Sequence, residues 1–271
     1  IFGSLYLRKH ARVPPGGFGI ANLRFADSDS APPRANTEYK PEEEVRLFYE
    51  VPGYERDSES NIAVVTQHQV LAPDGKPFFE IKTIEVRQKA GEDAGPVKCN
   101  FHIGLPPWAP PGNYTISIQA EDQIARKTQS SAATFSVSGP PLETSATLVA
   151  KNIDLANSRE GAALAPPVFT AGQSVWLRFR VLGLKAGEQG QIRLTEDWGI
   201  LGLDGKSVFQ QNEAELVNEQ FVYTPPFFPV TNHVNTPADF APGEYKFHVV
   251  LHDKIGGADF AFDPSFTITS P

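Results

Sequence analysis

Six histidines are the first residues that could bind a metal ion or act as a base. His248 and His252 lie four residues apart, so in a strand they would share one face at a separation of about 13 Å, at about 3.3 Å per residue. That separation is too large for one ion, and we predict an outward-facing, solvated pair. His68, His102 and His233 lie in unrelated segments. The sequence therefore predicts no catalytic residues and no Ser-His-Asp arrangement.

Acidic residues raise the question of calcium, which takes six to eight oxygen ligands. Asp122 and Asp253 recur near the ends of matching segments and are the better, though weak, candidates for a metal site. None of the acidic runs has the spacing of a known calcium loop. The alternative is that each aspartate hydrogen-bonds to the backbone of its own turn. We therefore expect no cofactor, and calcium at these two residues is the open alternative.

An outward-facing aromatic side chain could contact a sugar or a protein. Trp176 lies between Val175 and Leu177, which would both point to the core of an alternating strand. Aromatic residues are enriched in protein contacts. Three interpretations stay open for Trp176: packing within its own chain, contact with another subunit, and stacking on a glycan.

The N-terminal segment, residues 1–19, carries three cations, Arg8, Lys9 and Arg12, and no acid. One interpretation is an extra edge strand or a disordered terminus. The other is an extended arm that adds a strand to a sheet edge of another copy, as in β-augmentation. Contacts of this head-to-tail kind build filaments when they do not close into a ring. The residues predicted to make this contact are Phe2, Leu5, Tyr6 and Leu7.

The segments that must position these residues occur twice along the chain. Residues 39–53 match residues 169–183 in their alternating Val, Leu and aromatic positions. Further along and in the same order, an Asp-Gly-Lys turn and a Pro-Gly-Xaa-Tyr segment each occur twice, at nearly constant spacing. Ordered matches of this kind indicate two copies of one unit. The predicted divisions are an N-terminal extension (1–19), a first sandwich (20–139) and a second sandwich (140–271).

Each copy shows the period of a strand rather than of a helix. Val45, Leu47, Tyr49 and Val51 point one way in the first copy, and polar residues largely fill the alternate positions. Short apolar runs separated by turn residues give roughly seven strands per copy. The predicted fold class is all-β, with two tandem seven-stranded sandwiches.

A tyrosine follows the Pro-Gly turn in both copies, as Tyr114 and Tyr245. Immunoglobulin-like sandwiches place a tyrosine corner at such a position. With seven strands per copy, the pattern resembles the immunoglobulin-like and fibronectin-like modules found along bacterial secreted and surface proteins, over about residues 20–270. The resemblance implies that both tyrosines are structural, with the ring in the core and the hydroxyl bonded to nearby backbone.

The charge and composition of the chain limit the classes of partner and site that we expect. A formal net charge of −8 argues against a nucleic-acid binder held by phosphates. The single cysteine, Cys99, excludes an internal disulfide and a Cys-rich metal site. The apolar runs fall short of the roughly 18 residues that span a bilayer, so we expect no membrane insertion. A chain that begins at Ile1 and contains no Met suggests a processed, secreted protein.

Three functional hypotheses follow. The first is a non-enzymatic extracellular structural or adhesive protein at the cell surface, the subunit of a filament assembled through its N-terminal arm. Its partners would be other copies of itself or surface proteins. The second is a glycan-binding or accessory module of a larger secreted protein. The third is a periplasmic scaffold that binds a protein partner at an open sheet edge.

Overall fold

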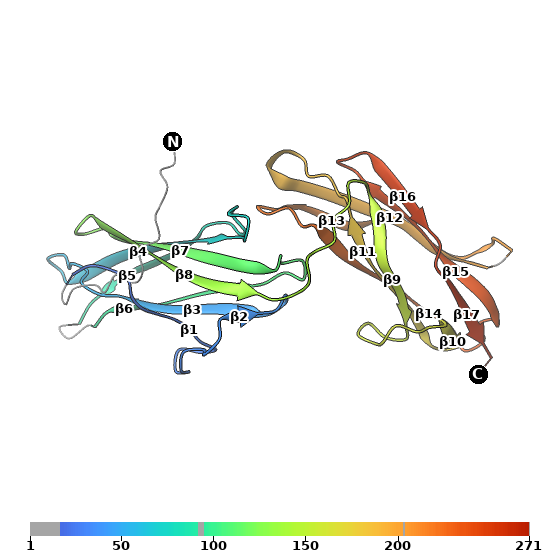
Figure 1. The fold of residues 1–271 in the computed structure, drawn as a ribbon, viewed down its shortest axis with the longest axis horizontal. Coiled ribbons are helices and arrows are strands. Elements are labelled where there is room, and N and C mark those ends of the chain that lie inside the picture. The colour runs from blue at the N-terminus through green and yellow to red at the C-terminus, as the bar shows by residue number, and fades with distance from the viewer. Residues whose placement is uncertain (1–16, 92–94, 203, 271) are drawn as a thin grey trace. The chain divides into compact units, whose positions relative to one another are not determined.

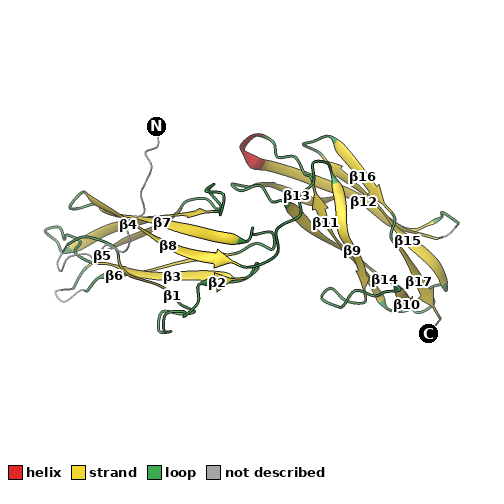
Figure 2. Cartoon of the chain, in the orientation of Figure 1, coloured by secondary structure: helices red, strands yellow, loops and turns green. Residues whose placement is uncertain are grey.

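The computed structural model describes residues 17–91, 95–202 and 204–270. The chain divides into two compact units after Pro141, which are called the first and second modules below. Strands make up the regular structure of these residues apart from one turn of 3₁₀ helix, η1 (Glu188–Gly190), drawn in red in Figure 2. The predicted all-β class is confirmed. The predicted contact residues of the arm, Phe2, Leu5, Tyr6 and Leu7, lie outside the described residues.

The first module contains two sheets (Figure 1). One has the strand order β1-β3-β6 and the other has the order β2-β8-β7-β4-β5. The strands of this module are β1 (Ala21–Phe25), β2 (Glu38–Tyr39), β3 (Glu44–Val51), β4 (Asn61–Leu71), β5 (Lys82–Lys89), β6 (Val97–Gly104), β7 (Gly112–Asp122) and β8 (Lys127–Val137).

The second module repeats this arrangement. Its sheets have the orders β9-β11-β14 and β10-β17-β15-β12-β13, and β16 also pairs with β15. The strands of this module are β9 (Val149–Ala156), β10 (Val168–Thr170), β11 (Ser174–Leu182), β12 (Gln191–Gly202), β13 (Ser207–Gln220), β14 (Phe227–Asn235), β15 (Gly243–Asp253), β16 (Ala258–Phe262) and β17 (Ser265–Thr269).

This order is that of an immunoglobulin-like sandwich. Strands β1, β3 and β6 occupy the places of A, B and E, while β4, β7 and β8 occupy those of C, F and G. Strand β5 extends the second sheet beyond β4, as the extra C′ strand does in variable-type domains. The corresponding edge strand in the second module is β13, which pairs with β12.

The strand count differs from the predicted seven. Eight strands are present in the described part of the first module, and the additional one is β2, which pairs with β8 in parallel over two residues. The second module has an equivalent parallel strand, β10, on β17, and its last strand is split into β16 and β17. Segments of two or three residues are too short to show an alternating pattern, which is why the sequence did not reveal them.

The alternating residues form the core as predicted. Val45, Leu47, Tyr49 and Val51 are each at most 2% exposed, because β3 places them on the face that packs against the opposite sheet. Phe48 lies at one of the alternate positions, between Leu47 and Tyr49, yet it is only 5% exposed. The guanidinium of a neighbouring strand's arginine, Arg24, lies 4.9 Å from the Phe48 ring and covers it.

A glycine ends the matched segment in both modules for the same reason. Gly53 has φ +70°, and a Cβ there would clash with the backbone of Gly17 and Phe18. Gly183 has φ +77°, and its Cβ would clash with the backbone of Thr147. The strand before each glycine therefore runs tightly against the chain that enters its module. Phe18 is itself 9% exposed, so the packed part of the first module begins no later than this residue.

Candidate functional site

The two corner tyrosines make the same hydrogen bond. The hydroxyl of Tyr114 donates to the carbonyl of Pro110 at 2.8 Å, and the hydroxyl of Tyr245 donates to the carbonyl of Ala241 at 2.8 Å. Each bond fixes the turn that precedes the strand to the strand itself. Antibody domains carry a cysteine two residues after the corner tyrosine. That place is taken here by fully buried apolar residues, Ile116 and Phe247.

Asp122 is 0% exposed and lies at the end of β7. Its Oδ1 accepts hydrogen bonds from the backbone N–H groups of Ile124 and Ala125, at 3.0 and 3.1 Å. Its Oδ2 accepts one from the N–H of Glu55, at 2.7 Å, in a loop far away in sequence. One carboxylate therefore holds its own turn and a second loop together, and we call this arrangement the carboxylate clamp.

Asp253 forms the same carboxylate clamp in the second module. It is 2% exposed, and its Oδ1 accepts hydrogen bonds from the backbone N–H groups of Ile255 and Gly256 at 3.1 and 2.9 Å. Its Oδ2 accepts one from the backbone N–H of Lys185 at 2.9 Å. This geometry is that of the turn-capping alternative, because both carboxylates face N–H donors, whereas a calcium ion needs oxygen ligands around it. Within the described ranges, His, Cys, Asp and Glu form no cluster of three or more that could hold a metal ion.

Trp176 is half-buried on β11, where it alternates with core residues. Its ring stacks on that of His233 in the neighbouring strand β14, with ring centroids 4.3 Å apart and planes 12° from parallel. On its other side the register partner is Ala156, which is fully buried. The ring of Trp176 therefore packs within its own module on at least one face. A sugar would have to use the remaining surface of this aromatic pair.

The next outward residue on β11, Arg178, anchors a loop. Its Nε and Nη2 donate to Oδ1 of Asp154 at 2.7 and 2.6 Å. Its Nη1 donates to the carbonyls of Arg159 and Gly161, at 3.0 and 2.8 Å. The positive charge beside Trp176 is thus engaged in holding the loop after β9.

The predicted solvated histidine pair is wrong for His252. Its Nδ1 lies 2.7 Å from Oδ1 of Asp259, its Nε2 lies 3.2 Å from Oδ2 of Asp197, and its side chain is only 20% exposed. Burial lowers the pKa of His252, but hydrogen bonds to Asp259 and Asp197 outweigh it, so this pKa is raised. His248 has a separate partner, Asp263, at 2.7 Å. Asp197 and Asp259 lie on the strands beside β15, and Asp263 lies between β16 and β17, so these partners become visible only once strand register is known.

A buried hydrogen bond links the two sheets through the core of the second module. Glu196 on β12 is 1% exposed, and its Oε2 accepts a hydrogen bond from Nδ2 of Asn232 on the opposite sheet, at 3.1 Å. Burial raises the pKa of Glu196 to about 7, although the bond from Asn232 lowers it. Glu196 pairs with Leu251, a core residue, so its carboxyl lies in the core. The sequence did not single out Glu196, because a carboxylate alone does not show whether its position in a strand faces the core.

The equivalent place in the first module has a different polar group. Thr66 occupies the position of Glu196, and its Oγ1 is hydrogen-bonded to the hydroxyl of Tyr49 at 2.9 Å. That hydroxyl also lies 2.7 Å from Nε2 of His68, whose Nδ1 lies 3.1 Å from the carbonyl of Lys82. A carbonyl only accepts, so Nδ1 carries the proton of this bond. Burial lowers the pKa of His68, which favours the neutral ring.

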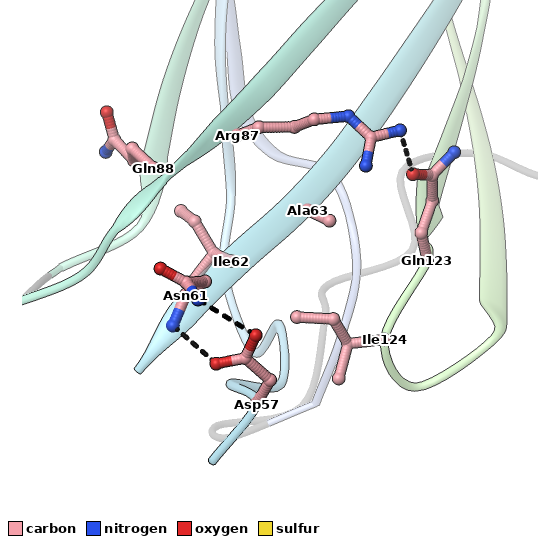
Figure 3. A pocket seen from close by; sticks show the side chains of 8 residues that line it. All are labelled: Asp57, Asn61, Ile62, Ala63, Arg87, Gln88, Gln123 and Ile124. Atoms are coloured by element: carbon pink, nitrogen blue, oxygen red, sulfur yellow. Dashed lines mark hydrogen bonds between the residues drawn. The ribbon is translucent and has the colours of Figure 1, made fainter. Parts of the chain in front are cut away.

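A polar hollow opens at one end of the first module (Figure 3). Asp57 in this hollow accepts hydrogen bonds from the backbone N–H and the side-chain amide of Asn61, at 2.8 and 3.0 Å. Arg87 reaches across β4 and donates to Oε1 of Gln123 at 2.6 Å. These polar side chains bind one another across the hollow and so fasten β4, β5 and the β7–β8 turn together.

Comparisons with known proteins give no family. No family model and no curated protein matches the chain. Among solved structures, the C-terminal domain of the antigen I/II-family protein AspA of Streptococcus pyogenes matches 93% of this chain and 99% of its own, with 12% identity and a TM-score of 0.30. The C-terminal domain of the AgI/II polypeptide BspA of Streptococcus agalactiae matches 92% and 99%, with 9% identity and a TM-score of 0.26. At these values neither likeness carries an argument about function.

Over the described residues, none of the helical structure has the length and apolar character that crossing a bilayer requires.

Proposed function

We propose that this chain is a non-enzymatic extracellular structural or adhesive protein that joins copies of itself at the cell surface through its N-terminal arm. The observation that carries the proposal is an open edge strand on the larger sheet of each module. Among the described strands, β5 and β13 each end the larger sheet of their module and pair on one side only. Such an edge presents unpaired N–H and C=O groups, to which another chain can add a strand.

The frame of each module, which consists of its carboxylate clamp and its corner tyrosine, supports the same proposal. The carboxylate clamps and corner tyrosines bind loops and turns to the strands in both modules. The polar groups involved hold backbone in place, which suits a protein whose task is to keep its shape while it presents an edge. The acidic body and the basic arm favour contact between different copies.

Light scattering and electron microscopy of two chains test this function. One is the full chain, and the other lacks residues 1–16 but keeps Phe18, which packs in the first module. We expect assemblies or fibres from the full chain and monomers from the shortened one. Monomers from both chains at high protein concentration would rule out assembly through the arm.

A glycan-binding function is the second candidate, and the stacked pair of Trp176 and His233 on the outer face of β11 favours it. Glycan-array binding by the full chain that is lost in Trp176→Ala but kept in Phe209→Ala, a partly exposed aromatic of another sheet, would support this candidate. Equal array signals for both variants and the full chain would exclude the Trp176 surface.

A further inference from the structure

We propose that the open edge of β13 is the docking site for residues 1–16 of a second copy, which add a parallel strand to it. This inference rests on the proposed assembly through the arm and names the surface that receives it. The edge concerned lies on the second module, where β13 closes the sheet order β10-β17-β15-β12-β13.

Strand β13 offers the longest edge among the described strands. It has 14 residues, which at about 3.3 Å per residue gives a length of about 45 Å. Its side chains are exposed at nearly every position. Two of them are large and apolar, Val208 at 51% and Phe209 at 38% exposed. An arm of 16 residues has the length to pair along this edge.

Charge distinguishes β13 from β5, the outer strand of the larger sheet in the first module. Strand β13 contains Glu213, Glu215 and Glu219 and no basic residue. Strand β5 contains two lysines and one arginine against a single glutamate. The arm has three cations and no acid, so it is repelled by β5 and attracted to β13. Two β13 edges also repel each other, which disfavours direct pairing between them.

The order of residues sets the direction of the added strand. The first half of β13, residues 207–212, is uncharged and holds Val208 and Phe209, while the acidic residues follow. The arm has its apolar residues within 1–7 and its cations within 8–12. The apolar residues of the arm therefore meet those of β13, and its cations meet the acidic residues, only when the two strands run parallel. Parallel edge pairing already occurs in both modules, as β2 on β8 and β10 on β17.

A labelled peptide of residues 1–16 tests the docking site by fluorescence anisotropy on the chain that lacks these residues. The test variant is Glu215→Lys with Glu219→Lys; Glu213 is left in place because Lys254 lies 3.6 Å from its carboxylate. We expect this variant to bind the peptide at least about tenfold more weakly. The control, Glu160→Lys with Glu244→Lys, makes the same charge change at exposed sites away from β13 and should bind as the parent does.

A second peptide sharpens the result. With Arg8, Lys9 and Arg12 replaced by glutamate, it should bind the Glu215→Lys, Glu219→Lys variant better than the parent. Equal binding of the original peptide to the variant, the control and the parent would overturn the docking site.

Direction is tested by a disulfide between a Leu5→Cys peptide and the chain. Pairing Phe2 with Val208 puts Leu5 beside Gln211, so Gln211→Cys should crosslink and Glu219→Cys should not. Cys99 is 5% exposed and does not compete. Preferential crosslinking to Glu219→Cys would overturn the parallel direction.

The same variants in the full chain separate this inference from the proposed function. If assembly needs the arm but tolerates the β13 variant, the arm docks elsewhere and only this inference fails. If the peptide binds β13 while the full chain stays monomeric, the docking site holds and the proposed self-assembly fails.

Discussion

The two modules share a frame but differ in the polar groups at their centres. Each has a corner tyrosine and a carboxylate clamp in equivalent places. In the core, the first module has His68 hydrogen-bonded to Tyr49, whereas the second has Glu196 bonded to Asn232. Contacts that hold the backbone are thus common to both, while the core polar group is particular to each.

This difference makes the two cores respond to pH in opposite directions. Burial lowers the pKa of His68, so the folded first module binds protons less readily than the unfolded chain and loses stability as pH falls below about 6.5. Burial raises the pKa of Glu196 from 4.5 to about 7, so the second module loses stability as pH rises across that interval. The four predictions below test the shared frame and the divergent cores in turn.

The largest effect is expected from the carboxylate clamps. Replacing Asp122 or Asp253 by alanine leaves three backbone N–H groups without their acceptor in a buried site. We expect each change to destabilise its own module by about 3–5 kcal/mol. Hydrogen-exchange mass spectrometry measures this module by module.

Two controls accompany this test. Asp74→Ala removes an exposed turn aspartate of the first module and should cost far less. If calcium at millimolar concentration stabilised the parent but neither alanine variant, the clamps would be metal sites and the turn-capping interpretation would be wrong.

The next effect concerns Glu196. Glu196→Gln keeps an oxygen for Asn232 but cannot ionise, so the variant should be more stable than the parent above pH 7. A pKa of about 7 against 4.5 corresponds to about 3 kcal/mol at 1.36 kcal/mol per pH unit. Denaturant unfolding between pH 4.5 and 8.5 should show the difference growing with pH.

Glu219→Gln is the matched control, since Glu219 lies exposed on the neighbouring strand β13. This change should leave the pH profile unchanged. A parent whose second module is equally stable at pH 5 and pH 8 would contradict the prediction for Glu196.

The corner tyrosines should give smaller and unequal effects. Tyr114→Phe leaves the Pro110 carbonyl without its donor next to a fully buried ring, and we expect a loss of about 1–2 kcal/mol. Tyr245 is only half-buried, so water can replace its hydroxyl and Tyr245→Phe should cost less. Equal losses in both modules, by thermal unfolding, would show that burial does not set the value of this contact.

Most features that the two modules share could be predicted from the sequence. Successive side chains of a strand point to opposite faces, so the alternation in residues 45–51 shows directly which of them are buried. The Pro-Gly-Xaa-Tyr segments are local patterns of the same kind. The backbone partner of Tyr114, the carbonyl of Pro110, lies at a turn that the sequence marks with proline and glycine, whereas the sequence did not indicate the bond from Asp122 to Glu55. The two-residue strand β2 did not show a period and was missed.

The divergent cores could not be predicted in the same way. Glu196 and Asn232 lie on different sheets, and His252 receives Asp197 and Asp259 from two other strands. These partners meet through register and sheet packing, which a single chain pattern does not specify. The sequence contained one signal, the carboxylate of Glu196 within β12. Its role in the core depends on Asn232, its partner on the opposite sheet.

The smallest effect on stability, and the sharpest comparison, comes from two histidines. His68 is buried in the first module with a lowered pKa, and His252 lies between two aspartates in the second with a raised pKa. His252 therefore contributes stability that is present below about 6.5 and is lost as pH rises through its raised pKa, and its ion pairs are worth about 1 kcal/mol or less. One NMR titration of the histidine ring carbons should find His68 titrating below about 6.5 and His252 above it. The variants His68→Gln and His252→Gln assign the two signals. If His68 titrated at a higher pH than His252, burial would not lower the pKa of His68. The two modules would then not respond to pH in opposite directions.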